Sequence, residues 1–293
     1  MEGVVAMGGG GKPGSARQGP ALRAQDGRRL LDGLRGRRIL ITGHTGFKGS
    51  WLSLWLAGLG ADVHGVALAP PTRPSLFEAA RVADVMQDHR LDIREHRALR
   101  RLVARLRPEI VLHLAAQPLV RASYAAARET FEINLMGSVH VFECARDTPS
   151  VRALVHVGTD KCYENREIPR GYRESDALGG HDPYSASKAT AELAFQSYLR
   201  SFFQVKGRPM AASGRAGNVI GGGDWASDRI VPDAMRALAA GRPLEVRNPR
   251  STRPWQHVLE ALSGYLVLAA RLAAGHTAVQ GPWNFGPAPR SVR

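Results

Sequence analysis

One stretch near the start of the chain, RILITGHTGFKGSWLSLWL at residues 38–56, constrains the fold more than any other feature. The β-branched run at residues 39–42 has the pattern of a buried strand, and residues 51–56 have that of a largely apolar helix. The glycines between them are Gly43, Gly46 and Gly49. Such a turn brings the N–H groups and positive dipole end of a new helix to the phosphates of a dinucleotide. The spacing is G-x-x-G-x-x-G rather than the common G-x-G-x-x-G, so a turn without a ligand remains the alternative.

Strand and helix patterns alternate as far as residue 215, which predicts an α/β fold with a Rossmann-type doubly wound parallel sheet. Further strands are expected at residues 62–68, 82–90, 109–115, 151–157 and 210–215, and further helices at 95–107, 130–146 and 184–203. After residue 216 come a glycine-rich loop at 221–225, helices at 228–241 and 258–274, and short strands at 244–247 and 282–285. We therefore expect a disordered N-terminal extension over 1–35, a dinucleotide-binding domain over 36–215 and a smaller substrate-binding lobe over 216–293.

Charge and cysteine content narrow the classes of partner and compartment. The 40 Lys and Arg residues exceed the 26 Asp and Glu residues by 14. The basic residues are scattered among acidic ones without an aromatic-interleaved stripe, which favours an anionic substrate over nucleic acid. The two cysteines, Cys144 and Cys162, give no disulfide framework, and no apolar run is long enough for a signal peptide or a membrane span. These features predict a cytoplasmic protein that binds neither nucleic acid nor membranes, and no metal site is predicted.

The candidate catalytic pair is a Tyr-x-x-x-Lys motif formed by Tyr184 and Lys188. Residues four apart share one face of a helix, so the Lys188 ammonium is expected beside the Tyr184 hydroxyl. A nearby cation lowers the tyrosine pKa from its reference of about 10, which predicts that Tyr184 is a base at neutral pH. The motif gains weight from the glycine turn and from Thr159, which stands at a strand end where open α/β sheets bind ligands. We expect the Thr159 hydroxyl to bond the substrate oxygen that Tyr184 deprotonates.

The glycine turn, the Thr159 strand end and the Tyr-x-x-x-Lys motif together resemble the extended short-chain dehydrogenase/reductase superfamily. Within it, longer stretches resemble the CDP-glucose 4,6-dehydratase family: GHTGFKGSWLSLWL, PPTRPSLFE, LAAQPLVRASY, TDKCYEN, RAGNVIGGGDWA and RPWQHVLE. The resemblance covers about residues 37–287, most of the chain. It implies a hydro-lyase of deoxysugar biosynthesis that uses tightly bound NAD to dehydrate CDP-D-glucose to CDP-4-keto-6-deoxy-D-glucose.

The resemblance also implies the order of events. Tyr184 takes the C4 hydroxyl proton while hydride leaves C4 for the nicotinamide; water then leaves across C5–C6, and hydride returns to C6. Asp160 and Lys161 stand where related dehydratases carry an Asp-Glu pair, so Asp160 is the natural acid and Lys161 the candidate base or a cation beside the enolate. A basic Lys161 requires a strongly depressed pKa, and a surface ion pair between the two residues is the alternative.

Epimerase relatives share the tyrosine and lysine but lack the dehydratase acid–base pair. A nucleotide-sugar 4-epimerase is therefore the nearest alternative enzyme. A catalytically inactive NAD-binding protein is the alternative from a different functional class.

Resemblance and local chemistry together suggest the contacts to cofactor and substrate. The predicted cofactor-binding residues are Gly43, Thr45, Gly46, Phe47, Lys48, Gly49, Asp92, Ile93, Leu114, Ala115, Gln117, Tyr184 and Lys188. The predicted substrate-binding residues are Asn218, Arg229, Arg253 and Trp255. For Asp92 a helix cap is an alternative, and for Lys48 a surface position. NAD itself rests on the resemblance, because the second strand ends in Ala67 and Leu68 without the acid expected at the ribose 2′-hydroxyl, and the nearby Arg73 suits a 2′-phosphate.

Two polar residues lie inside predicted regular elements. Asn134, a poor helix former, is expected to bond a neighbouring backbone near the site, with a solvent-facing side chain as the alternative. His113 is expected to be a satisfied core histidine.

The last expectations concern the C-terminus and assembly. Because the resembled family runs beyond Arg293, we expect either a truncated chain or a partner that covers the substrate-binding lobe. The family is also typically oligomeric through helices like those predicted at 130–146 and 184–203, so a homo-oligomer is expected.

Overall fold

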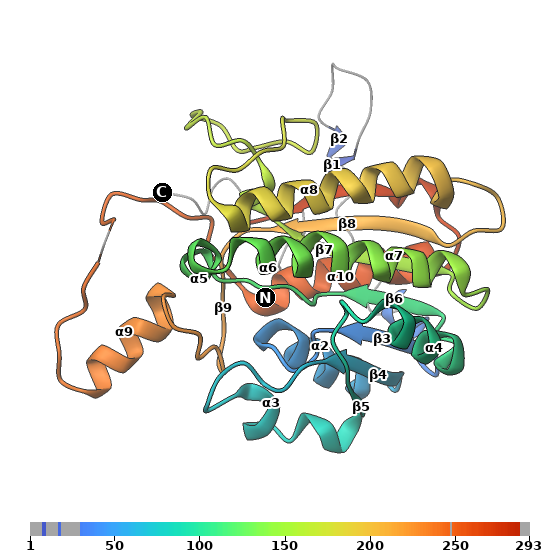
Figure 1. The fold of residues 1–293 in the computed structure, drawn as a ribbon, viewed down its shortest axis with the longest axis horizontal. Helices are drawn as coiled ribbons and strands as arrows, with labels where there is room; N and C mark the ends of the chain where they lie inside the picture. The colour runs from blue at the N-terminus through green and yellow to red at the C-terminus, as the bar shows by residue number, and fades with distance from the viewer. Residues whose placement is uncertain (1–7, 10–16, 19–29, 247, 288–293) are drawn as a thin grey trace.

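A computed structural model describes residues 8–9, 17–18, 30–246 and 248–287, and its centre is a parallel sheet of seven strands (Figure 1). The strands are β3 (Arg38–Thr42), β4 (Asp62–Ala67), β5 (Gln87–Arg90), β6 (Ile110–His113), β7 (Ala153–Thr159), β8 (Met210–Ala216) and β11 (Gly281–Phe285). Their spatial order is β11-β8-β7-β6-β3-β4-β5, and each neighbouring pair is parallel. The order reverses between β3 and β6, which is the switch point where doubly wound sheets bind ligands. The predicted fold class is confirmed.

Helices cover both faces of this sheet. One face carries α4 (His96–Leu106), α7 (Gly137–Asp147) and α8 (Pro183–Tyr198), which bury Leu99, Phe142 and Phe195 against it. The other face carries α2 (Phe47–Gly58) and α10 (Val258–Ala273), which share a second apolar core. Figure 1 shows α7 and α8 on the near side of the sheet and α10 behind it. Because both faces are buried, the central strands carry almost unbroken apolar runs rather than alternating ones.

The shorter elements lie at the ends and edges of the sheet. They are β1 (Gly8–Gly9) and β2 (Arg17–Gln18), α3 (Leu76–Ala79), α5 (Val120–Ala125), α6 (Ala127–Phe131), α9 (Ile230–Ala239), and β9 (Val219–Ile220) paired with β10 (Gln256–His257). Single 3₁₀ turns cover Val82–Val85, Asp160–Cys162 and Thr277–Val279, and π-helical turns cover Glu132–Met136 and Leu199–Phe203. In Figure 1, α9 stands apart from the sheet on long connections.

Several predicted elements differ from the structure. The strand predicted over 82–90 is a 3₁₀ turn followed by β5, and the described part of the strand predicted over 244–247, residues 244–246, is irregular. The helices predicted over 130–146 and 184–203 each contain a π-helical turn, at Glu132–Met136 and at Leu199–Phe203. The spacing of apolar residues could not predict these differences, because a short apolar run is compatible with a strand, a turn or a helix.

The predicted division of the chain at residue 216 is wrong for its last two elements. β11 pairs with β8 from Gly281 opposite Ala212 to Phe285 opposite Ala216, and α10 packs in the same core as α2. Both therefore belong to the sheet and its helix layer. The substrate-binding role predicted for the rest of that region stays a prediction.

The predicted N-terminal extension, residues 1–35, lies mostly outside the described residues. Its end does not: Leu34 is fully buried in the core shared by α2 and α10. The packed structure therefore begins before residue 36.

Candidate active site

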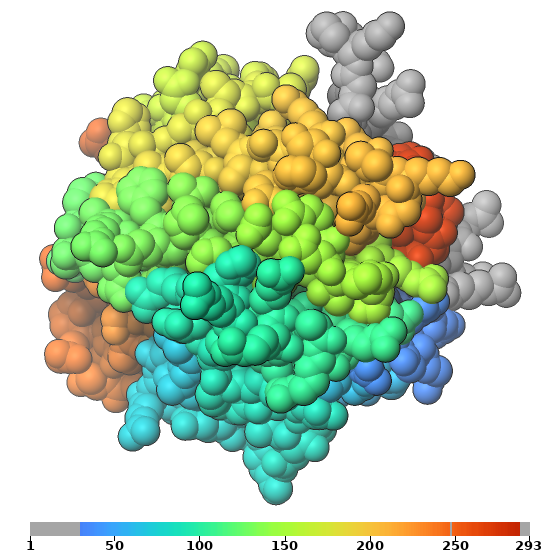
Figure 2. Space-filling view, turned by 45° about the vertical axis from the view of Figure 1, so that its right-hand side comes forward, coloured from blue at the N-terminus to red at the C-terminus, as the bar shows by residue number. Residues whose placement is uncertain are grey.

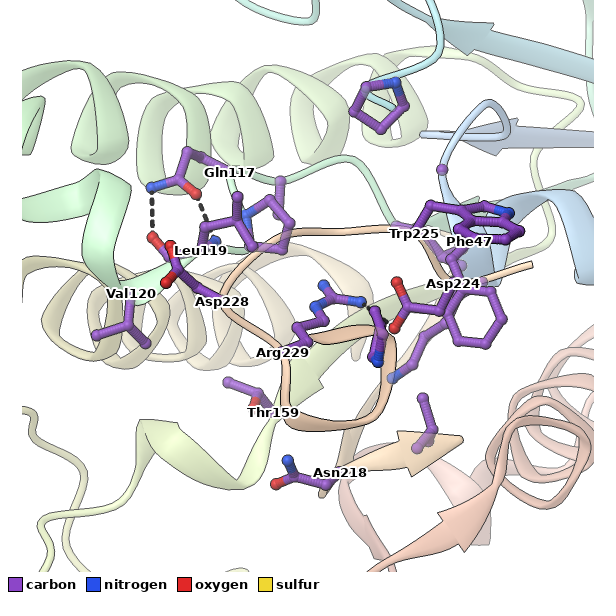
Figure 3. A pocket seen from close by; sticks show the side chains of 18 of the residues that line it. Phe47, Gln117, Leu119, Val120, Thr159, Asn218, Asp224, Trp225, Asp228 and Arg229 are labelled. Atoms are coloured by element: carbon purple, nitrogen blue, oxygen red, sulfur yellow. Dashed lines mark hydrogen bonds and ion pairs between the residues drawn. The ribbon is translucent and has the colours of Figure 1, made fainter. Parts of the chain in front are cut away.

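A cavity of about 1130 Å³ opens at the carboxyl ends of β3, β6, β7 and β8. Every residue predicted to bind cofactor or substrate, or to act in catalysis, lines it. These residues are Gly43, Thr45, Gly46, Phe47, Lys48, Gly49, Asp92, Ile93, Leu114, Ala115, Gln117, Thr159, Asp160, Lys161, Tyr184, Lys188, Asn218, Arg229, Arg253 and Trp255. The sheet thus brings residues between 43 and 255 to one concave surface, part of which is shown in Figure 3.

The glycine turn forms an anion-binding cradle at one end of the cavity. Gly43 has φ +78°, and a Cβ there would stand 2.7 Å from the backbone nitrogen of Ala115. A Cβ at Gly49 would stand 2.1 Å from the Gly43 carbonyl oxygen, so only glycine lets α2 start this close to β3. Gly46 is the N-cap of α2, makes no side-chain cap bond, and no acidic residue stands in the first turn. The N–H groups and dipole of α2 are therefore directed to an anionic ligand such as a dinucleotide diphosphate.

Polar contacts fix the loop that follows β6. The Asn134 side chain accepts a hydrogen bond from the Gln117 backbone N–H at 2.8 Å, and donates to the Gln117 carbonyl at 3.1 Å and to the Ser187 hydroxyl at 2.9 Å. The expectation that Asn134 bonds a neighbouring backbone is confirmed, and the solvent-facing alternative is wrong. His113 hydrogen-bonds with Thr42 and Ser138, so it is the satisfied core histidine that the sequence predicts.

Asp92 lies beside the same cavity, but its carboxylate is already engaged. It accepts hydrogen bonds from the backbone N–H and the guanidinium of Arg94, at 2.9 and 2.7 Å. Burial raises the pKa of Asp92, but these Arg94 contacts outweigh it and leave the pKa below its usual value. The carboxylate thus stabilises a local turn before α4, whose N-cap is Glu95 rather than Asp92. The contact of Asp92 with the cofactor stays a prediction.

Tyr184 and Thr159 meet in the centre of the cavity. Asp182 caps α8 by accepting a hydrogen bond from the Ser185 N–H at 2.9 Å, and Pro183 starts the helix, which sets Tyr184 in its first turn. Burial raises the pKa of the Tyr184 phenol to about 12, although the side-chain hydrogen bond with Thr159 lowers it. The hydroxyl is therefore protonated at neutral pH in the protein alone.

The predicted effect of Lys188 on this pKa is wrong for the protein alone. The Lys188 ammonium is buried and donates a hydrogen bond to the Val157 carbonyl at 3.1 Å, and burial lowers its pKa. The charge of Lys188 therefore lies next to the backbone of β7 near its carboxyl end. The charge of Arg229 lowers the Tyr184 pKa.

Asp160 and Lys161 form a short 3₁₀ turn directly after Thr159. The Thr159 hydroxyl donates to Asp160 Oδ1 at 3.1 Å and accepts from the Lys161 backbone N–H at 3.3 Å. Lys161 Nζ lies 5.9 Å from the centroid of the Tyr184 ring. Burial lowers the pKa of Lys161, and the charge of Asp160 opposes that shift. Both residues line the cavity, and the ion pairs of the described residues include none between them, so the surface-pair alternative is wrong.

The predicted substrate residues lie on the far wall, on the segments around β9 and α9. Arg229 pairs with Asp224 at 2.9 Å, as Figure 3 shows, and the Arg253 guanidinium bonds the Thr252 carbonyl. The Asn218 carbonyl accepts the Gln256 N–H at 3.1 Å, which joins β9 to β10. Arg229 and Arg253 bring positive charge to a wall suited to a nucleotide diphosphate.

Lys48 lies among these charged groups rather than on the surface. Burial and, to a smaller extent, the charge of Arg229 lower the pKa of its ammonium to about 8, while the charges of Asp160 and Asp224 oppose the shift. The alternative of a surface lysine is therefore wrong.

Sequence reasoning missed two residues of this region. Asp224, the partner of Arg229, lies in the glycine-rich loop at 221–225, but no role was predicted for its carboxylate. Glu192 is fully buried on α8, four residues after Lys188. The repeated spacing of four from Tyr184 to Lys188 to Glu192 is the signal that points to it.

Two features are absent from the described ranges, 30–246 and 248–287 with the two short N-terminal strands. These ranges hold no group of three or more His, Cys, Asp or Glu side chains arranged for a metal ion. In the same part of the chain no helix has the length and apolar character needed to cross a membrane.

Comparisons with known proteins agree with this geometry. The model of the NAD dependent epimerase/dehydratase family matches residues 39–284. The chain is 52% identical over 257 residues to a CDP-glucose 4,6-dehydratase from Salmonella typhimurium, covering 86% of this chain and 72% of that protein. It is also similar to two solved structures that contain NAD. A dTDP-glucose 4,6-dehydratase from Streptomyces venezuelae has 26% identity, a TM-score of 0.71 and coverage of 85% of this chain and 75% of its own. A UDP-glucose 4-epimerase from Thermus thermophilus has 27% identity, a TM-score of 0.69 and coverage of 85% and 77%.

Proposed function

The chain belongs to the NAD-dependent epimerase/dehydratase family, and on that premise we propose that it dehydrates CDP-D-glucose to CDP-4-keto-6-deoxy-D-glucose. The similarity to the Salmonella enzyme supports this substrate. The observation that carries the reaction type is the Thr159-Asp160-Lys161 turn, because it sets an acid and a partly buried lysine beside Tyr184.

The cavity fits NAD at its glycine-turn end. The α2 N-terminus and the close approach of Gly43 to Ala115 suit the diphosphate, and Leu114, Ala115 and Gln117 follow β6, which passes beside it. When bound, NAD supplies a hydride acceptor that later returns the hydride, together with a positive charge. The protein's own residues bind the substrate, orient it and move the protons.

In the first step, Tyr184 is the acceptor of the C4 hydroxyl proton. Thr159 and Tyr184 both line the cavity, and Thr159 lowers the Tyr184 pKa, so a sugar hydroxyl placed between the two contacts both hydroxyls. Because the Tyr184 phenol is protonated in the protein alone, it must release its proton before it can accept one. The positive charge of Arg229, which lines the same cavity, favours that release.

In the second step, Asp160 and Lys161 act on C6 and C5. Once C4 is a ketone, C5–H is acidic enough for the Lys161 amine to take its proton. The C6–O bond breaks as Asp160 gives its proton to the departing hydroxyl, which leaves as water. Lys161 then returns a proton to C5 when hydride reaches C6. The lowered pKa of Lys161 supports a larger share of free amine at neutral pH.

A 4-epimerase is the second candidate, because the Thermus relative is a UDP-glucose 4-epimerase and Tyr184 and Lys188 serve either reaction. Incubation with CDP-, UDP- and dTDP-glucose separates the candidates. We expect the alkaline ultraviolet absorbance of a 4-keto sugar, highest for CDP-glucose. An epimerised sugar without a keto product contradicts dehydration, and equal kcat/KM for the three nucleotides contradicts the choice of base.

We also propose a homo-oligomer formed through α5–α8. The face that carries these helices exposes large apolar side chains, among them Tyr124 at 68% and Leu193 at 53%. Figure 2 shows α6, α7 and α8 side by side across one broad surface. Light scattering of the wild type and of Leu193→Asp measures the molar mass in solution. We expect the wild type to be a dimer and the variant to dissociate into monomers. A monomeric wild type contradicts it. We also propose a cytoplasmic location, because the two cysteines, Cys144 and Cys162, form no disulfide and are both free and buried.

A further inference from the structure

A buried ion pair lies directly behind the catalytic helix. Glu192 and Arg215 are both fully buried, and their side chains meet at 2.8 Å. Glu192 follows Tyr184 and Lys188 at intervals of four on α8, and its charge raises the pKa of Lys188 against the effect of burial. Arg215 lies on β8 opposite Gly158 of β7. The pair therefore joins the helix that carries Tyr184 to β8, the strand that lies beside the one ending at Thr159.

Arg215 also reaches the loop that follows Lys161. Its guanidinium donates a hydrogen bond to the Tyr163 hydroxyl at 2.9 Å and to the Glu174 carbonyl at 3.2 Å. Tyr163 in turn donates to Asn284 Oδ1 on β11 at 2.7 Å. One guanidinium thus ties α8 and β8 to the residue two positions after Lys161, and through it to the edge strand of the sheet.

The backbone beside Thr159 is shaped to admit this pair. A Cβ at Gly158 would stand 2.5 Å from Glu192 Oε1 and 3.3 Å from Arg215 Cγ. Gly158 immediately precedes Thr159, so the strand end that presents the reactive turn packs against the side chains of both Glu192 and Arg215.

A buried ion pair of this kind contributes little net stability, because desolvation offsets its attraction. It does fix geometry, because Glu192 Oε2 accepts from two guanidinium nitrogens and from the Ser213 hydroxyl at 2.8–2.9 Å. Breaking that arrangement leaves a charge without a partner.

We propose that Glu192, Arg215 and Tyr163 are positioning residues that hold the Asp160-Lys161 turn in register with Tyr184 on α8. The inference rests on the proposed dehydration, in which two groups on that turn must reach C5 and C6 while Tyr184 reaches C4. Tyr184 is held by its own helix, whereas the turn depends on the network. Loosening the network therefore slows elimination more than oxidation.

The test is Tyr163→Phe, which removes one hydroxyl, keeps the ring and leaves Glu192 and Arg215 paired. Tyr172→Phe is the matched control, because Tyr172 stacks on Tyr163 at 5.2 Å and its hydroxyl contacts the exposed Arg166 and Asn165 instead. Hydrogen exchange is measured first, without substrate. The amides of Glu164 and Gly179, which bond the Ala177 and Cys162 carbonyls, should exchange faster in Tyr163→Phe than in the control.

Kinetics with CDP-glucose follow in both variants. In Tyr163→Phe we expect kcat to fall by about tenfold or more, with KM nearly unchanged and reduced nicotinamide accumulating during turnover. Unchanged exchange at both amides overturns the inference whether or not the protein dehydrates CDP-glucose. A normal elimination rate, or an equal slowing of oxidation and elimination, also overturns it. A wild type that turns over no nucleotide sugar contradicts the proposed function instead.

Discussion

Replacement of Lys161 by methionine separates the two chemical steps of the proposed reaction. Methionine keeps an unbranched chain of similar length and removes the amine. No ion pair of the described residues joins Lys161 to Asp160, so the change leaves no broken pair behind. Oxidation at C4 relies on Tyr184 and Thr159 and should proceed, whereas removal of the C5 proton should fail.

The expected size of this effect follows from the environment of Lys161. Loss of a positioned general base lowers a rate by roughly 10²–10⁴. Burial lowers the pKa of Lys161, which raises the share of free amine available to act as that base. The elimination rate of the wild type should also rise with pH through the Lys161 pKa, and the variant should lose that rise.

The assay is the absorbance of reduced nicotinamide after addition of CDP-glucose, followed by product analysis. Lys161→Met should accumulate reduced cofactor and little keto-deoxy product. Lys206→Met is the control, because Lys206 is exposed and does not line the cavity. Product formed at the wild-type rate would refute a catalytic lysine, and a variant that never reduces the cofactor would place Lys161 in the first step.

Three further predictions concern the base, the glycine turn and stability. Tyr184→Phe should lower kcat by roughly 10²–10⁴ without accumulation of reduced cofactor, because its block precedes hydride transfer; near-normal turnover would remove Tyr184 from the mechanism. Gly49→Ala should destabilise the protein by about 1–3 kcal/mol and weaken retention of NAD, because its Cβ would meet the Gly43 carbonyl; an unchanged melting temperature and NAD content would contradict the close approach. Asp176 has its pKa lowered to about 2 by hydrogen bonds from Arg170 and the Arg173 N–H, so it contributes stability above its unfolded pKa that is lost as pH falls through 2. Asp176→Asn should accordingly lower the melting temperature at pH 7 and have little effect near pH 2, and a pH-independent difference would argue against this origin.

The central part of the fold could be predicted from the sequence because its signals are local. The run at 39–42, the three glycines and the apolar helix specify one supersecondary unit, and repeated alternation specifies a parallel sheet. The place of β11 could not be predicted in the same way. The sequence of a five-residue strand does not indicate which strand it pairs with. The pairing of β11 with β8 is fixed by tertiary packing, such as the edge-to-face contact of Phe285 with Tyr265.

The candidate site shows the same contrast. Motif spacing predicts that Tyr184, Lys188 and Thr159 lie in one site, and in the structure all three line one cavity. Motif spacing does not predict how burial and nearby charges together set the pKa of a side chain. The predicted fall in the Tyr184 pKa was wrong because burial acts on the phenol while the Lys188 ammonium is bonded to Val157. The Glu192–Arg215 pair joins residues 23 positions apart and becomes visible only when α8 lies against β8.

The path of the hydride tests the central claim most directly. CDP-glucose labelled with deuterium at C4 is incubated with the protein, and the product is examined by mass spectrometry and NMR. If the protein dehydrates CDP-glucose as proposed, the deuterium appears at C6 of a 4-keto-6-deoxy sugar, because the same site removes and returns it. Deuterium found at C4 of an epimerised sugar, or a keto-deoxy product without deuterium at C6, would contradict the account.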